Sequence, residues 1–76
     1  MSMEEESLTI RAAEVAKAQD QGIDMAFTVA QLKAEASQHD EQTRHRLAEQ
    51  AREELLELGA TGMRTLLTIF QIASLA

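Results

Sequence analysis

Two histidines and two acidic residues near the middle of the chain come closest to forming a metal or acid–base site. His39, Asp40 and Glu41 are consecutive, and His45 follows Glu41 by four residues. On a helix that begins at Asp40, Glu41 and His45 would share a face, as two ligands of one metal ion can. One carboxylate and one imidazole make a weak site, and no third ligand lies nearby in the sequence. We therefore predict a polar turn here, with no metal site and no cofactor.

Catalysis by a nucleophile or by paired acids finds no support in the sequence. The chain has no cysteine, and no serine follows a glycine-rich turn or stands at a recognisable spacing from a histidine. The acidic residues Glu53, Glu54 and Glu57 are typical of a solvated helix face. A chain of 76 residues rarely encloses a cleft that would raise the pKa of such a carboxyl group for general acid–base work. The protein is therefore expected not to be an enzyme.

A single arginine within an apolar segment is the remaining candidate for chemistry. Arg64 lies among Thr61, Thr65 and Thr68 near the start of the C-terminal segment. In one interpretation the threonines bond to local carbonyl groups and Arg64 extends into solvent. In the other, Arg64 meets an anion where subunits join, because its planar guanidinium can donate two parallel hydrogen bonds to a phosphate. Arg64, Thr61 and Thr65 are the candidate ligand-binding residues.

The segment from Gly59 to Ala76 has one charged side chain and is otherwise mostly apolar. Wound as a helix, it places large apolar side chains on two opposite sides, so both sides must be buried. We expect the rest of so short a chain to be insufficient for this, and predict self-association through this segment. Its last 12 residues are uncharged, too few to span a membrane, which takes about 20. The predicted interface residues are Met25, Phe27, Met63, Leu66, Leu67, Ile69, Phe70 and Ile72.

The composition favours an all-α protein. Alanine, leucine, glutamate and glutamine, which are strong helix formers, predominate, and proline is absent. We predict an acidic, frayed N-terminus over residues 1–6 and a single domain over residues 7–76. This domain is expected to be a helical hairpin whose two long antiparallel arms, near residues 7–37 and 41–75, assemble into a homo-oligomeric bundle. Asp40 is predicted to cap the second arm.

Two glycines leave the continuity of the arms open. Gly22 could end a first helix, with Asp24 capping a second helix that begins at Met25. The apolar stripe keeps its phase through this region, and an internal glycine costs only about 1 kcal/mol, so we favour one helix bent at Gly22. Gly59 is expected either to follow the end of a helix, with Thr61 capping a new one, or to kink a continuous helix.

The net charge of −6, from 13 acidic and 7 basic residues, argues against DNA, RNA and anionic membranes as partners. The first ten residues carry acids where a secretory signal would carry lysines followed by an apolar run. Together with the absence of cysteine, this predicts a cytoplasmic location.

The sequence from Gly59 to Ala73, GATGMRTLLTIFQIA, resembles the last helix of a family of phage anti-defence proteins. That helix has a threonine, an apolar residue two positions on, and a small and apolar run. The resemblance implies a helical hairpin that assembles into a hexamer and sequesters cyclic oligonucleotide or related signals of bacterial immune systems such as CBASS and Thoeris. It carries over Thr61, Thr65 and Arg64 as ligand contacts. Members of the family use an aromatic ring to stack on a base, whereas this chain has no tyrosine or tryptophan.

Taken together, these features predict a small binding protein without catalytic activity. It is expected to self-associate through its C-terminal segment and to regulate a partner protein, as a phage-encoded anti-defence factor would inside a bacterial host. The alternative is an oligomeric sponge that sequesters a cyclic nucleotide-type signal at subunit junctions. A sponge would need a positively charged pocket built from Arg44, Arg46, Arg52 or Arg64.

Overall fold

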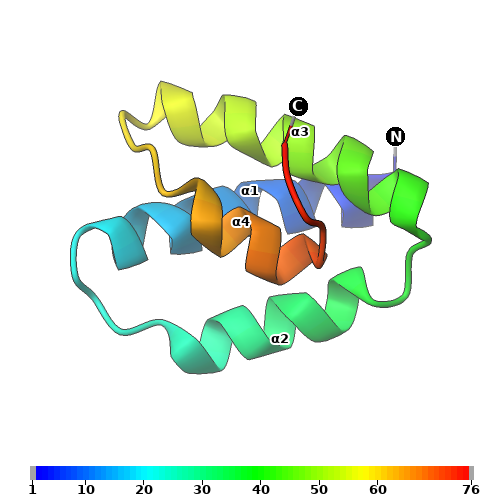
Figure 1. Ribbon diagram of the computed structural model, residues 1–76, viewed down its shortest axis with the longest axis horizontal. Coiled ribbons are helices and arrows are strands. Elements are labelled where there is room, and N and C mark those ends of the chain that lie inside the picture. Colours follow the sequence, from blue (N-terminus) through cyan, green and yellow to red (C-terminus); the bar gives the residue numbers. More distant parts are fainter. Residues whose placement is uncertain (1, 76) are drawn as a thin grey trace.

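This computed structural model describes residues 2–75 of the chain, which contain four α-helices (Figure 1). They are α1 (Met3–Asp20), α2 (Ala26–Ala36), α3 (Glu41–Glu57) and α4 (Met63–Phe70). No residue in this range belongs to a β-strand, so the all-α prediction is confirmed. None of these helices combines the length and the apolar character that crossing a membrane requires.

The first arm of the predicted hairpin is two helices, so the prediction of one helix bent at Gly22 is wrong. Gly22 adopts the left-handed conformation, with φ of 85°. Its amide donates to the carbonyl of Gln19 at 3.0 Å, and the Ile23 amide donates to that of Ala18 at 3.0 Å. These two bonds satisfy the last carbonyl groups of α1 and turn the chain away. Asp24 Oδ1 then accepts a hydrogen bond from the Ala26 amide at 3.0 Å, where α2 begins.

The second arm is broken in the same way at Gly59, so the continuous arm over residues 41–75 is also wrong. Gly59 has φ of 80°, and the Ala60 amide donates to the carbonyl of Leu55 at 3.1 Å. The prediction that Gly59 follows a helix C-terminus is thus confirmed. The residue that caps α4 is Gly62, without a side-chain hydrogen bond, and not Thr61 as predicted. The molecule is therefore a four-helix arrangement and not a hairpin of two long arms.

Both longer helices begin with a side-chain cap. Asp40 Oδ1 accepts a hydrogen bond from the Thr43 amide at 2.8 Å, which confirms its predicted role at the start of α3. The Ser2 hydroxyl accepts one from the Glu5 amide at 3.1 Å at the start of α1. α1 begins at Met3, within the segment that was predicted to be frayed, and Met1 lies outside the described residues. Glutamates in this first turn match the positive end of the helix dipole.

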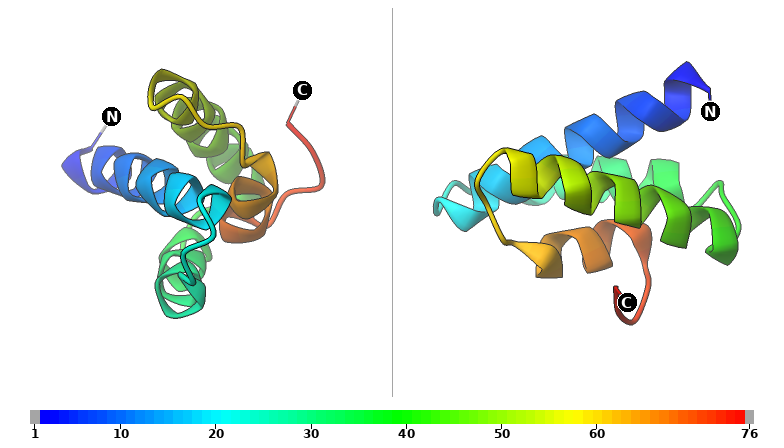
Figure 2. Two further views of the ribbon diagram at one scale, coloured as in Figure 1. Left: turned by 90° about the vertical axis from the view of Figure 1, so that its left-hand side faces the viewer. Right: turned by 90° about the horizontal axis from the view of Figure 1, so that it is seen from above.

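The short helix α4 contacts each of the other three helices and lies at one side of the bundle (Figure 2). α1 packs along α3, and α2 lies on the far side of α4 from α3. Alanines of α1 and α3 allow these two helices to approach closely, because a methyl group leaves little volume between the backbones. The buried apolar residues are Leu8, Ala12, Ala13, Val15, Ala16, Leu32, Ala36, Leu47, Ala48, Ala51, Leu55, Ala60, Leu66, Ile69, Phe70 and Ile72.

This arrangement buries the C-terminal segment within the chain itself. Leu66, Ile69 and Phe70 each have 0% of their surface exposed, and their spacing of three and four residues places them on one face of α4. The expectation that the chain has too little material to cover both sides is therefore wrong. It fails because α4 ends at Phe70, so the buried side chains of this helix share one face, and that face packs against three longer helices.

The end of α4 is fastened to two neighbouring helices. Gln71 takes the left-handed conformation with φ of 57°, and its side-chain amide donates to the Lys33 carbonyl at 3.1 Å and to Ser37 Oγ at 2.8 Å. The Arg44 guanidinium donates to the carbonyl of Phe70 at 2.9 Å and to that of His39 at 2.6 Å. A left-handed conformation costs a residue with a side chain about 1 kcal/mol or more, and these contacts offset that cost.

Replacing Gly59 with alanine is expected to lower the free energy of unfolding by about 1–2 kcal/mol. No atom lies within 4 Å of the added Cβ, so the loss comes from the left-handed backbone and not from a collision. Gly59→Asn is the matched control, since asparagine tolerates this conformation better and should lose less. Urea unfolding of both variants measures the difference, and an alanine variant as stable as the original would contradict the assigned conformation.

Candidate functional site

Two of the three predicted ligand-binding residues come together at one hollow, between α2 and α4. Arg64 and Thr65 line it, whereas Thr61 is exposed and does not. The hollow has a volume of ≈ 400 Å³. Its lining residues are Gln19, Ala26, Val29, Ala30, Lys33, Arg64, Thr65 and Thr68. Lys33 was not predicted, because no spacing rule relates it to Arg64 across the sequence.

The hydroxyl groups of this hollow already have partners. Thr65 Oγ1 donates to Gln19 Oε1 at 2.7 Å, which ties α4 to α1. Thr68 Oγ1 donates to the Arg64 carbonyl at 3.1 Å, within α4. Thr68 therefore follows the interpretation in which threonines bond local carbonyl groups, and Thr65 bonds a side chain of another helix. Neither Arg64 nor Lys33 forms an ion pair within residues 2–75, and both side chains are exposed.

The predicted interface residues are divided between the core and the surface. Leu66, Ile69, Phe70 and Ile72 are buried in the chain's own core. Met25, Met63 and Leu67 are partly buried against that core. Phe27 differs from all of these, since 76% of its surface is exposed.

Phe27 stands on the outer face of α2, at the edge of the molecule. Ala30, Gln31 and Ala34 follow it at intervals of three, four and seven residues, and all are exposed. These intervals place the four side chains on one stripe of the helix. We call this stripe, Phe27, Ala30, Gln31 and Ala34, the Phe27 face. It carries no charge, in a protein of which 26% of the residues are charged.

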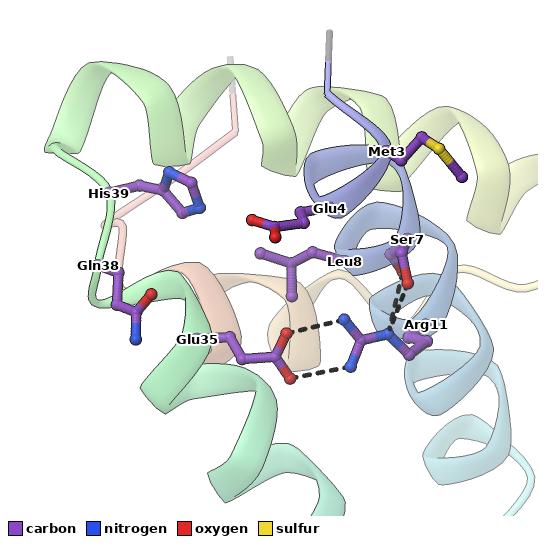
Figure 3. Close-up of a pocket in the computed structure, with 8 residues that line it drawn as sticks. All are labelled: Met3, Glu4, Ser7, Leu8, Arg11, Glu35, Gln38 and His39. Carbon is purple, nitrogen blue, oxygen red and sulfur yellow. Dashed lines mark hydrogen bonds and ion pairs between the residues drawn. The ribbon is translucent and has the colours of Figure 1, made fainter.

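A second hollow, of about 380 Å³, lies between the start of α1 and the end of α2 (Figure 3). Its residues are Met3, Glu4, Ser7, Leu8, Arg11, Glu35, Gln38 and His39. The Arg11 guanidinium donates to both oxygens of Glu35, at 2.8 and 2.7 Å, and its Nε donates to Ser7 Oγ at 3.1 Å. A serine, a histidine and two carboxylates thus meet here, which sequence analysis did not anticipate. Arg11 donates hydrogen bonds to both Glu35 and Ser7, so the cluster joins α1 and α2 and acts as a clamp between them.

The charges of this clamp stabilise each other. The hydrogen bond from Arg11 is the largest effect and holds the pKa of Glu35 below its usual value. Burial opposes it, and the Arg11 charge adds a smaller lowering. The same hydrogen bond raises the pKa of Arg11. A carboxylate stabilised in its charged form is a poor general base at neutral pH. The pair is therefore structural.

The predicted polar turn contains a helix cap at Asp40 and a pair formed by His45 and Glu41. Asp40 caps α3, and the bond from Thr43 lowers its pKa. His45 Nε2 lies 3.9 Å from a carboxylate oxygen of Glu41, one turn away on α3. Within residues 2–75, no three histidine, aspartate or glutamate side chains gather as a metal site would require.

An acidic hollow of about 280 Å³ lies between α1 and α3. Glu6, Glu53, Glu54 and Glu57 line it, and the side-chain oxygen of Gln50 is buried there without a hydrogen-bond partner. Glu53 and Glu57 are exposed, in agreement with the predicted solvated face of α3.

No family model, no curated protein and no solved structure matches this chain. Its function is therefore inferred from its own side chains.

Replacing Glu35 with glutamine is expected to lower the free energy of unfolding at neutral pH by about 0.5–1 kcal/mol, since the pair with Arg11 is half exposed. The folded-state pKa of Glu35 is depressed, so the pair stabilises the fold above the unfolded-state pKa of about 4.3. This contribution is lost as the pH falls through the folded-state pKa.

Urea unfolding at about pH 7 and about pH 3 tests this linkage. The difference between the original protein and Glu35→Gln should shrink at the lower pH. Glu53→Gln is the matched control, because Glu53 is exposed and forms no ion pair in the described part of the chain. A Glu35→Gln difference that is independent of pH would contradict the role of the charge.

Proposed function

We propose that this protein is a non-enzymatic binding protein that regulates a partner protein by docking through the Phe27 face. The observation that carries the proposal is the exposure of Phe27, at 76%. The chain has two aromatic residues, and the other, Phe70, is completely buried. Burying a phenylalanine side chain is worth about 1.5–3 kcal/mol, and Phe27 leaves nearly all of this unused in the free protein.

The surroundings of Phe27 suit a protein partner. Three small or uncharged side chains, Ala30, Gln31 and Ala34, continue the stripe along α2. A helix that presents such a stripe can lie in an apolar groove, with the aromatic ring as its anchor. Aromatic anchors surrounded by side chains of low energetic weight are typical of interface hot spots. The partner is therefore expected to offer an apolar socket that accepts the Phe27 ring.

Self-association remains a prediction, but the C-terminal side chains that were expected to form its interface are not available on the surface. The C-terminal side chains that were expected to pair between subunits, chiefly Leu66, Ile69 and Phe70, are enclosed by the chain's own helices. Of the predicted interface residues, Phe27 is the one that stays exposed for a second copy in the described part of the chain. We propose that a different protein occupies this face, and the experiment below separates the two occupants.

The partner is identified by placing a photo-crosslinking benzoylphenylalanine at position 27 in the cells that make the protein. We expect one predominant adduct with a different protein. The same probe at exposed Glu53 on α3 is the control and should not give that adduct. An adduct of twice the chain mass would show a second copy at the face, and equal adducts from both positions would contradict a specific docking surface.

Once the partner is identified, Phe27→Ala is expected to weaken binding by about thirtyfold or more, which is typical for the loss of an aromatic hot-spot residue. Leu56→Ala removes a side chain on α3 that is 49% exposed, and should change affinity by less than about threefold. Calorimetric titration measures both. An effect of Phe27→Ala no larger than that of Leu56→Ala would contradict the anchor role.

The two phenylalanines should also differ in their effect on stability. Phe27→Ala is expected to change the free energy of unfolding by less than about 0.5 kcal/mol, because its ring is exposed. Phe70→Ala should cost about 3–5 kcal/mol, as it empties the core around α4. Thermal or urea unfolding checks this contrast, which also shows that any binding loss in Phe27→Ala is not a folding loss.

A further inference from the structure

The hollow between α2 and α4 combines two cations with an apolar surface. Lys33 and Arg64 come from different helices and line the same space of ≈ 400 Å³. Ala26, Val29 and Ala30 supply its apolar side. No aspartate or glutamate is among the lining residues, so the hollow is locally positive in a protein with a net charge of −6.

Other arginines of the chain are committed to the fold. Arg11 pairs with Glu35, and Arg46 pairs with Glu5 at 3.2 Å. Arg44 donates to two carbonyl groups at the end of α4 and the start of α3. Arg64 lies in the first turn of α4, and its side chain makes no comparable contact with any of residues 2–75. Its donors are therefore available to a ligand.

The hydrogen-bonding groups of the hollow define what it can bind. The protons of Thr65 and Thr68 are already donated, so these hydroxyls have only acceptor capacity left. Gln19 accepts from Thr65 through Oε1, which leaves its side-chain NH₂ as a donor. The remaining donors are thus Lys33, Arg64 and Gln19. This set suits the oxygens of an anion, which accept and do not donate.

We infer that the hollow between α2 and α4 binds a small organic anion, with a carboxylate or phosphate group held by Lys33 and Arg64 and an apolar body against Ala26, Val29 and Ala30. Arg64 presents a planar fork of donors and Lys33 a compact charge, so the two complement each other around one anionic group. The hollow shares Ala30 with the Phe27 face, but the inference does not depend on Phe27, which is not among the residues of the hollow.

The test uses 1-naphthyl phosphate and 1-naphthoate, which carry the two anionic groups on the same apolar ring. Neutral 1-naphthol and inorganic phosphate are the controls, since each has only one half of the recognised chemistry. Amide spectra of ¹⁵N-labelled protein should show saturable shifts at Lys33, Arg64, Thr65 and Thr68, with a Kd of about 1 mM or tighter for at least one anion. Comparison of the two anions shows which group is preferred.

Lys33→Gln and Arg64→Gln are each expected to weaken binding of the preferred anion by about tenfold, because each removes a charged donor. Lys17→Gln, on α1, removes the same charge away from the hollow and should leave the affinity within about twofold. Thermal unfolding of every variant shows that the fold is kept.

Any of four results would overturn the inference. Three of them are that neither anion gives saturable shifts, that 1-naphthol binds as well as the anions, and that Lys17→Gln weakens binding as much as Lys33→Gln. Shifts confined to the Phe27 face would likewise overturn it, by showing that the ring binds the exposed aromatic residue.

Discussion

The burial of α4 is the constraint on which the rest of the structure depends. Leu66, Ile69 and Phe70 lie on one face of this short helix, at spacings of three and four residues, and each is fully covered. That face packs against three separate helices, whereas in a hairpin of two straight arms it would have one neighbouring helix. A chain of this length has a small core, so leaving its most apolar helix exposed would remove much of its stability. The division of each arm follows from this requirement.

Left-handed residues make the division possible. Gly22 and Gly59 end α1 and α3, and Gln71 ends α4, in each case with φ between 57° and 85°. At each of these ends, the second amide beyond the helix returns to a carbonyl of the last turn. The helices therefore end with their backbone groups satisfied, and the chain can reverse direction within a few residues. Side chains then secure the breaks, as Arg44 and Gln71 do around the end of α4.

Local patterns predicted the features that depend on near neighbours. The all-α class, the cap at Asp40 and the helix end at Gly59 follow from propensity and from the conformations that single residues allow. The break at Gly22 was missed, because an internal glycine costs so little that tertiary packing decides between a bend and a break. The clamp of Arg11 with Glu35 and the shared hollow of Lys33 with Arg64 join residues that are far apart in sequence. No periodicity encodes such pairs; they follow from which helices α4 brings together.

The peripheral position of α2 has a consequence for how this protein can change. Its inner side chains Leu32 and Ala36 belong to the core, whereas Phe27, Gln31 and Ala34 contribute little to it. Substitutions on an exposed helix face usually alter stability by less than about 0.5 kcal/mol. Mutation can therefore redesign the outward stripe of α2 while α1, α3 and α4 preserve the scaffold. Recognition and folding are encoded by largely separate residues, so a new specificity can evolve on this small domain without a compensating change in its core.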